Sequence, residues 1–513
     1  GENMEISTYL EKTIDSELSA NVIDLCPVGA LTSKPYQFEA RPWELKKTET
    51  IDVMDAVGSN IRVDTYGWKV KRVLPRLNED INEEWISDKT RYACDGLLTQ
   101  RLDEPYIRKD NKLSVVEWSE ALAKVTSYLN EYKVDEIAFL SGDLCDLETL
   151  YLYKKLSDAL SIKNVECRQE GCNIPFTHPS QYSFNTKIAD IEKSDCILIV
   201  GSNVRQEAPI INARIRKHKL ATNVPIAVIG ANLDLTFEYE HLGEDLNLLS
   251  DLISNKNNFS KIIEAAANPM IIIGNSILNR KDSISIFSVI EELIHKYKFL
   301  QDDWNGFNVL QIAAARTGAL NLGLYKQGSS LEKIYCAAED DKIKLIISLG
   351  ADEINFDRLK GAKVIYIGTH GDKGANKADI ILPSAAYTEK DGIYINTEGR
   401  LQYAFKASFP PGNAKEDWKI INELSNLLDL NWDIIDLANV RSMLQSDFSH
   451  LFNFDSSAYP KYERLLANKA PVTNLCNSNV DYVIKDFYLT NAITRNSKTM
   501  AECSQARNEL LEQ

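Results

Sequence analysis

The stretch Cys196-Ile-Leu-Ile-Val-Gly-Ser-Asn203 decides the fold that this sequence predicts. Five apolar residues follow one another and end at a glycine and two small polar residues. A strand that is buried on both faces of a parallel sheet has this pattern, whereas a half-exposed strand alternates apolar and polar residues. The same pattern recurs at 137–140, 226–229, 270–273, 345–349 and 364–367, and each run ends at or near a glycine.

Helical stretches lie between these apolar runs, for example Ile210–Leu220 and Ser285–Tyr297. Strands and helices alternate in this way in βαβ units, whose crossover helices cover both faces of the sheet. We therefore predict an α/β body at 97–435, doubly wound, with largely parallel sheets in two lobes. No GxGxxG follows any of the strands and no Walker motif occurs, so the sequence does not predict a dedicated dinucleotide site.

A small β-rich module is predicted at 41–96, ahead of the body. Ile61–Val63 and Trp68–Val73 broadly alternate with the period of two that is typical of strands. A module of about fifty residues is small for a self-sufficient core. Because no cysteine or histidine lies between Cys26 and Cys94 to bind a metal, we expect a neighbouring domain to support it.

The two ends of the chain lack the βα alternation of the body. Residues 436–513 are mixed and polar, and we expect them to pack on the body or on a partner. The chain begins at Gly1 without an initiator methionine, which we interpret as the start of a fragment of a longer polypeptide. Residues 1–20 are predicted to form a helix, because apolar side chains recur at every fourth position: Ile6, Leu10, Ile14 and Leu18.

The overall composition excludes some classes of function. A net charge of −16 argues against non-specific binding to nucleic acid or anionic lipid, because no basic excess is present to displace counterions. No uninterrupted apolar window is long enough to span a membrane, so any membrane role is expected to be peripheral. Nine cysteines without paired spacing or CxxC favour a reducing compartment over a disulfide framework.

Cys26-Pro-Val-Gly29 is the first candidate for chemistry. A cysteine followed by proline is the pattern by which the last thiolate of a [4Fe–4S] site is supplied. A lone cysteine is more often a small buried apolar residue, and the spacing alone leaves both interpretations open.

A second open segment is Ala378–Gln402. It predicts a short strand that stops at Pro383 and a loop that carries Glu389, Glu398 and Arg400. The loop is either a solvated turn with ordinary surface charges or a segment that closes over something at the sheet edge. Its spacing does not decide between the two.

Several long strings of the sequence resemble the large iron–sulfur subunit of respiratory complex I, the proton-pumping NADH:quinone oxidoreductase. The resemblance runs from end to end of the chain. It is carried by 21–36, 40–44, 51–60, 82–91, 168–171, 201–203, 207–209, 304–308, 487–490 and 497–501.

The resemblance implies a role in electron transfer, from a flavin-side cluster toward quinone-side clusters, with no acid–base or nucleophilic residue. It makes Cys26 the fourth ligand of a [4Fe–4S] cluster whose other three ligands come from a CxxCxxC run upstream of Gly1. Residues 1–40 are then the end of a cluster-binding domain, and a [2Fe–2S] and a second [4Fe–4S] site would also lie upstream.

The same resemblance implies partners and a place in the cell. The partners are other subunits of the peripheral arm of complex I, including the flavin-bearing and quinone-side ones. The site is peripheral, on the cytoplasmic face of a bacterial inner membrane or the matrix side of a mitochondrial one.

The body of this family is similar to the molybdopterin oxidoreductases, many of which carry a cysteine quartet near their start. The quartet is spaced CxxC, three residues, C, then about twenty-seven residues and C. Laid on this chain, that spacing places Asp52, Asp55, Ser59 and Ser87 at the four positions. Oxygen ligands do not replace the thiolates of an iron–sulfur cluster, so we predict an emptied site. The resemblance to complex I implies that the body is a scaffold without molybdenum. The alternative is an active molybdopterin oxidoreductase of the formate dehydrogenase type, with Cys167 or Cys172 on the metal.

Overall fold

The computed structural model describes residues 14–172, 174–326, 329–455, 457–464, 475 and 479–511. Most of the helix predicted at 1–20 lies outside these ranges. Over 14–20 that prediction is wrong, since turns precede the five-residue helix α1 (Asn21–Leu25). Ser16 and Ser19 explain this, because the Ser16 hydroxyl accepts the N–H of Leu18 and the Ser19 hydroxyl donates to the Ser16 carbonyl. Serine side chains that bond nearby backbone in this way compete with helix formation.

The β-rich module is an antiparallel three-stranded sheet, as the alternation predicted. It comprises β1 (Lys46–Ile51), β2 (Asn60–Tyr66) and β3 (Lys69–Pro75). Two short helices follow it, α2 (Asp88–Tyr92) and η2 (Ala93–Leu98). Its buried residues form one cluster with Tyr387 and Tyr394 of the body and with Ile493 and Met500 near the C-terminus, which is the support from neighbours that the size of the module requires.

The first lobe of the body is built around a seven-stranded sheet of order β5-β4-β17-β16-β15-β6-β7. The five strands from β17 to β7 are parallel, and the β4–β5 hairpin adds an antiparallel edge. The strands are β4 (Tyr106–Lys109), β5 (Lys112–Val115), β6 (Ile137–Ser141), β7 (Asn164–Glu166), β15 (Leu345–Leu349), β16 (Lys363–Gly368) and β17 (Ile380–Pro383). The helices of this lobe are α3 (Trp118–Glu131), α4 (Leu147–Ala159), α11 (Arg316–Leu322), α12 (Leu331–Glu339), α13 (Lys373–Lys377), α14 (Asp417–Leu427) and α15 (Leu437–Asp447).

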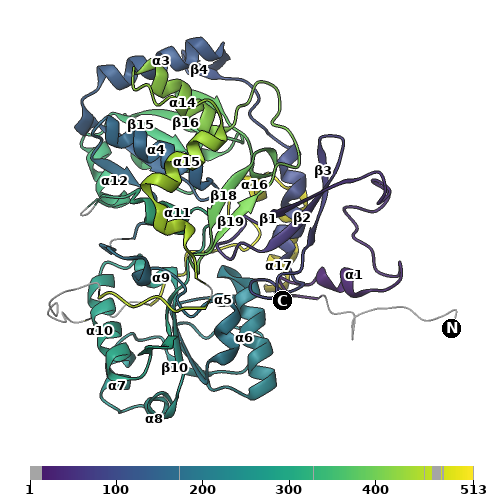
Figure 1. Cartoon of the computed structure of the whole chain (residues 1–513), viewed down its shortest axis with the longest axis vertical. Coiled ribbons are helices and arrows are strands. Elements are labelled where there is room, and N and C mark those ends of the chain that lie inside the picture. The colour runs from purple at the N-terminus through teal and green to yellow at the C-terminus, as the bar shows by residue number, and fades with distance from the viewer. Residues whose placement is uncertain are drawn as a thin grey trace.

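The second lobe is inserted between β7 and β15 and contains a five-stranded, entirely parallel sheet of order β10-β9-β8-β11-β14. The α/β body with largely parallel sheets in two lobes is therefore confirmed. Figure 1 shows the first lobe above, the second lobe below, and the β module with α1 beside them. The strands are β8 (Cys196–Val200), β9 (Ile226–Ile229), β10 (Glu240–Gly243), β11 (Pro269–Ile273) and β14 (Phe307–Val309), with the small β12 (Leu300–Gln301) and β13 (Trp304–Asn305). The helices are α5 (Val204–Glu207), α6 (Pro209–Thr222), α7 (Leu248–Ile253), α8 (Phe259–Ala265), α9 (Asn275–Leu278) and α10 (Ser283–Lys296).

The loop after Pro383 is buried, so the interpretation as a solvated turn is wrong. It contains the hairpin of β18 (Gly392–Ile395) and β19 (Leu401–Ala404). Glu389 is 4% exposed and forms a two-pronged ion pair with Arg101, with N–O distances of 2.5 and 2.6 Å. Glu398 is 6% exposed and accepts the backbone N–H of Ile188 at 2.8 Å. Asn396 also donates to the carbonyl of Val57 in the module at 3.1 Å, so the loop joins the module and both lobes.

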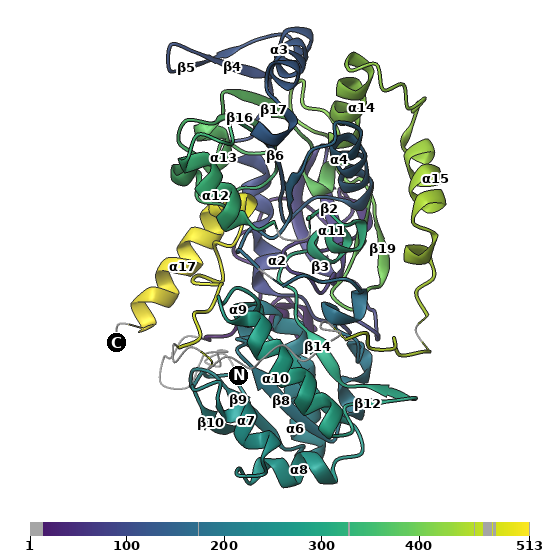
Figure 2. The same cartoon turned by 90° about the vertical axis from the view of Figure 1, so that its left-hand side faces the viewer.

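The last described residues return to the start of the chain, and they pack on the molecule itself. They form α16 (Ala492–Arg495) and α17 (Lys498–Leu511), which lie against η2. Arg507 on α17 pairs with Glu17 at 3.2 Å, and the Asp95 carboxylate accepts the N–H of Thr499 at 2.9 Å. Figure 2 shows α17 on the opposite side of the molecule from α15. Among the described residues, no helix is both long and apolar enough to cross a membrane.

Candidate functional site

Cys26 lies in a half-exposed loop directly after α1, where the helix ends. Its backbone N–H donates to the carbonyl of Ile23 at 3.3 Å, and its sulfur lies 3.0 Å from the carbonyl oxygen of Val28. The backbone N–H groups of Leu31 and Val28, and to a lesser degree that of Ala30, lower the pKa of the Cys26 thiol below its ordinary value. An accessible thiolate among convergent N–H groups is a suitable ligand for iron, because hydrogen bonds to sulfur stabilise its negative charge.

This arrangement fits one ligand of a cluster, not a whole site. In the described part of the chain, no group of three or more His, Cys, Asp or Glu side chains is placed to hold a metal ion. The remaining thiolates that a [4Fe–4S] cluster needs are therefore not supplied by the residues around Cys26 that the structure describes.

The four positions predicted to be an emptied site are all buried in the β module. Asp52, Asp55, Ser59 and Ser87 are each at most 2% exposed. The backbone N–H of Asp52 donates to the Ser59 carbonyl at 2.8 Å. The Asp52 carboxylate accepts the hydroxyl of Thr90 at 2.9 Å, and that hydroxyl lies 2.8 Å from the Ser87 hydroxyl. Hydrogen bonds within the chain therefore link three of these positions.

A buried lysine, Lys89, supplies positive charge at this place. It is 2% exposed, its ammonium donates to the Thr490 hydroxyl at 3.2 Å, and it lies 4.7 Å from the ring centroid of Phe487. Its charge acts on both Asp52 and Asp55. Burial raises the pKa of Asp52 to about 7, with a further contribution from the nearby Asp55, and burial also raises the pKa of Asp55.

These residues do not fit an iron–sulfur cluster. Asp52, Asp55, Ser59 and Ser87 provide no thiolate, and an ammonium group cannot bind iron. The charges of Lys89, Asp52 and Asp55 instead offset one another inside the module. The sequence analysis did not identify Lys89 as a residue of this site. Its place two residues after Ser87, the last quartet position, was the signal that could have indicated it.

A cofactor of an open α/β sheet binds where the strand order reverses, outside the carboxyl ends of the strands. This point lies between β6 and β15 in the first lobe and between β8 and β11 in the second. In both lobes glycines let the backbones of the two strand ends approach closely at this point. A Cβ on Gly142 would lie 1.8 Å from the carbonyl oxygen of Gly350, and one on Gly274 would lie 2.1 Å from that of Gly201.

The C-terminal segment covers both of these strand ends. In the second lobe, the hydroxyl of Tyr482 accepts the N–H of Ala231 at 3.1 Å, beside the glycine that ends β9. In the first lobe, residues 491–493 line a cavity of about 50 Å³ next to Gly350. A larger hollow of about 390 Å³ shares the lining residues Asp143, Gln169 and Glu353 with this cavity, so the C-terminal segment does not fill the strand ends of the first lobe completely.

The two cysteines of the molybdenum alternative are also enclosed. Cys167 and Cys172 are each 2% exposed, and burial raises their pKa values to about 12 and about 11. Arg168 between them is held by Glu166, with an Nε–Oε1 distance of 2.7 Å.

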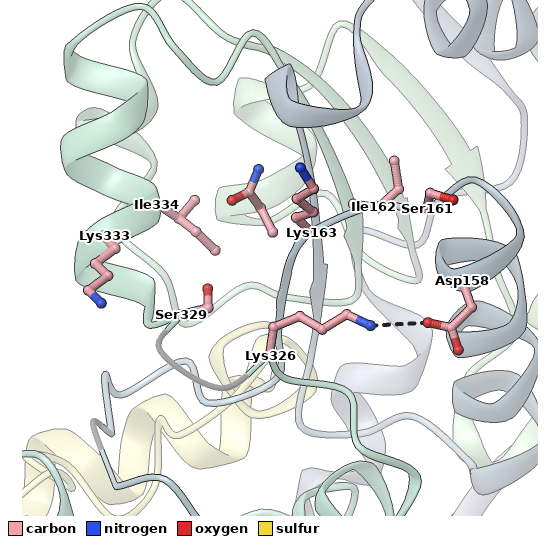
Figure 3. A pocket seen from close by; sticks show the side chains of 9 residues that line it. Asp158, Ser161, Ile162, Lys163, Lys326, Ser329, Lys333 and Ile334 are labelled. Atoms are coloured by element: carbon pink, nitrogen blue, oxygen red, sulfur yellow. Dashed lines mark hydrogen bonds and ion pairs between the residues drawn. The ribbon is translucent and has the colours of Figure 1, made fainter.

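A surface hollow of about 510 Å³ lies between the end of α4 and the start of α12 (Figure 3). Three lysines line it, but all three are engaged. Lys326 pairs with Asp158 at 3.2 Å and Lys163 with Asp135 at 2.9 Å, while Lys333 also has an interaction partner. Surface lysines that are already paired do not form a built anion site.

Models of known families match successive parts of the chain. The description of the first is "NADH-quinone oxidoreductase subunit 3, ferredoxin-like domain", and it matches 1–32. The next is "NADH-ubiquinone oxidoreductase NDSU1/NuoG-like, 4Fe-4S domain", at 45–95. "Molybdopterin oxidoreductase" matches 101–427, and the model of the C-terminal part of the NADH-ubiquinone oxidoreductase G subunit matches 459–503.

Whole proteins also resemble this chain. The G subunit of NADH-quinone oxidoreductase from Rickettsia bellii is 43% identical over 99% of the chain and 73% of the relative. The mitochondrial NADH-ubiquinone oxidoreductase 78 kDa subunit of Neurospora crassa is 44% identical over 99% of the chain and 69% of the relative. Among solved structures, acetylene hydratase from Pelobacter acetylenicus has a TM-score of 0.55 at 12% identity, covering 81% of this chain and 74% of that one, which shows a shared fold.

Proposed function

Because this chain belongs to the family of the NADH-quinone oxidoreductase G subunit, which is part of complex I and has a molybdopterin-oxidoreductase-type body, we propose that Cys26 supplies the fourth thiolate of a [4Fe–4S] cluster. Complex I is an oxidoreductase that transfers electrons from NADH to quinone, and other complex I subunits are the partners of this chain. The observation that carries the proposal is the Cys26 loop, which presents a half-exposed thiol with a lowered pKa among backbone N–H groups.

In this proposal the other three thiolates come from a CxxCxxC run upstream of Gly1, as do a [2Fe–2S] and a second [4Fe–4S] site. Cys26 would hold one iron of the cluster, which when bound would supply one-electron transfer from the flavin-side centre toward the quinone-side clusters. Burial, ligand charge and hydrogen bonds to sulfur set the potential at which it does so. No side chain of this chain acts as an acid, a base or a nucleophile.

We propose four parts for the chain. Residues 1–40 end the cluster domain, 41–96 are a module whose cluster has been replaced by charged side chains, 97–435 are a scaffold without molybdenum, and 436–513 fasten the scaffold. The oxygen side chains at the four quartet positions, which provide no thiolate for a cluster, support this division of labour over an active enzyme of the formate dehydrogenase type. The flavin-bearing and quinone-side subunits would be direct neighbours, on the negative face of a coupling membrane.

The test uses the full-length subunit in the assembled complex. Cys26→Ser is expected to remove one four-iron EPR signal and to lower the iron content. Cys336→Ser changes an exposed cysteine in α12 and serves as the control that leaves all signals in place. A Cys26→Ser complex that keeps every four-iron signal would refute the assignment. Molybdenum or a pterin in the purified wild-type complex would refute the scaffold role.

A further inference from the structure

We infer that Arg91 positions the Cys26 ligand loop and sets the reduction potential of the cluster that Cys26 would bind. This inference rests on the proposed function of Cys26. Arg91 belongs to α2, a five-residue helix that lies between the module and α1. It is only 4% exposed although it carries a permanent positive charge.

The contacts of Arg91 hold α1 at two points. Its Nη2 donates to Asn21 Oδ1 at 3.0 Å and to Asp24 Oδ2 at 2.5 Å. Asn21 begins α1, and Asp24 lies two residues before Cys26, where the helix ends. One guanidinium therefore spans the short helix whose last turn leads into the cysteine.

Neighbours of Arg91 in the sequence fix the same helix. The Asp88 carboxylate accepts the backbone N–H of Ala20 at 2.9 Å. Asn21 donates to the carbonyl of Ile86 at 2.8 Å, and it accepts the N–H of Ile86 at 3.2 Å. A five-residue helix is too short to be stable by itself, so these contacts determine where α1 and its C-terminal cysteine lie.

The other side of α2 is anchored in the replaced cluster site. Lys89 offsets the charges of Asp52 and Asp55, and the Thr90 hydroxyl donates to Asp52. Through α2, the position of the Cys26 loop therefore depends on the buried charges of Lys89 and Asp52. Asp52 occupies one of the positions at which the related enzymes have a cluster ligand.

Arg91 also lies close to the residues that flank Cys26 in the sequence. Among the described residues its buried Nε has no hydrogen-bond partner. The side chain lines a hollow of about 460 Å³ together with Asp24, Leu31 and Ser33 of the Cys26 segment. A buried cation beside this segment favours the reduced state of a cluster, because reduction adds one electron. The charge of Arg91 therefore raises the potential, and that of Asp24 lowers it.

The test is a redox titration, followed by EPR, of full-length subunit in the assembled complex. It monitors the signal that Cys26→Ser removes. Arg91→Gln is expected to lower the midpoint potential, so that the reduced-to-oxidised ratio at a fixed ambient potential falls by at least about threefold. Asp24→Asn is expected to raise the midpoint potential. A general loss of structure would not shift the potential in opposite directions in Arg91→Gln and Asp24→Asn. Arg91→Lys keeps the charge without the planar fork, and its shift should be smaller than that of Arg91→Gln.

Arg316→Gln is the matched control, because Arg316 is likewise buried, at 2% exposed, and paired with a carboxylate, that of Asp143 at 3.1 Å, but lies on α11 of the first lobe. It should leave the potential unchanged. An unaltered potential in Arg91→Gln at full iron content overturns the inference, and so does a shift of the same sign in Asp24→Asn. If Arg91→Gln does not assemble, Asp24→Asn alone decides by the sign of its shift. A signal that survives Cys26→Ser instead overturns the proposed function, whatever Arg91 does.

Discussion

Replacing Lys89 with methionine removes the positive charge that acts on Asp52 and Asp55 and keeps most of the apolar stem. The stem still packs in the module, so the change is mainly electrostatic. Lys89 is 2% exposed, and its charge acts on two carboxylates that are at most 2% exposed, those of Asp52 and Asp55. Without it, both carboxylates stay buried with no opposing charge at hand.

The expected loss can be worked out from this geometry. Lys89 acts on these carboxylates through its charge and not through an ion pair, and such an attraction between unit charges about 4–5 Å apart is worth about 3–4 kcal/mol at an effective dielectric constant of about 20. The lower end applies here, because the pKa of Asp52 is already raised to about 7 and this group can take up a proton at little cost. A loss of about 3 kcal/mol corresponds to an increase of about 150-fold in local opening, since each 1.4 kcal/mol is a factor of ten.

Amide hydrogen exchange of peptides that cover 46–75 measures this opening directly, without requiring the whole chain to unfold in one step. Lys69→Met is the matched control, because Lys69 is an exposed lysine on β3 of the same sheet. It should change exchange by no more than about twofold.

A second substitution tests the electrostatic cause. Asp55→Asn added to Lys89→Met removes one of the two unopposed charges, while the amide oxygen can still accept the N–H of Val57, which Asp55 accepts at 2.8 Å. The double variant should regain at least about tenfold of the lost protection. Exchange in Lys89→Met that rises less than about fivefold, or a double variant no better protected than the single one, would show that Lys89 does not offset these carboxylates.

Three further predictions concern the body. Burial raises the pKa of Glu207 from its ordinary value of 4.5 to about 7. The folded state therefore binds a proton at Glu207 that the unfolded chain releases at lower pH. The stability that this bound proton contributes is lost as pH rises through 7. Glu207→Gln should therefore melt higher than wild type at about pH 8 and equally at about pH 5; a higher melting temperature at both would contradict this. Gly142→Ala should abolish a soluble fold, because its Cβ would meet a carbonyl oxygen at 1.8 Å, whereas Gly29→Ala, with nothing within 4 Å, should melt like wild type. Tyr482→Phe leaves the N–H of Ala231 unpaired, which should cost about 1 kcal/mol and raise hydrogen exchange at that amide about fivefold. Unchanged exchange at Ala231 would contradict the role of this contact.

The strands of the body were predictable because their signal is local. The apolar run Leu345–Leu349 can satisfy its backbone only by pairing on both sides, and in the structure it does so with β6 and β16. The failure at 14–20 was local too. Apolar spacing favoured a helix there, but the side-chain hydrogen bonds of Ser16 and Ser19 to the backbone prevailed.

The buried charges were not predictable from the sequence, because their partners lie far along the chain. Glu389 looks like a surface acid until the fold places Arg101 beside it, 288 positions away. Arg91 meets Asn21 and Asp24 across 70 and 67 positions, and no periodic pattern marks it. For Cys26, the sequence pattern indicated the residue type, while the N–H groups around its sulfur could be seen only in the structure.

The way the C-terminal segment closes both lobes has a consequence for biosynthesis. β6 leaves the ribosome long before β15, and the strand ends of both sheets wait for residues around 482–493. α17, which binds Glu17 through Arg507, is made after every other helix and strand described here. A nascent chain therefore exposes open crevices and an unfastened module, and it is a target for chaperones and proteases. The start of the described chain is therefore fastened only when α17 has been made and Arg507 meets Glu17.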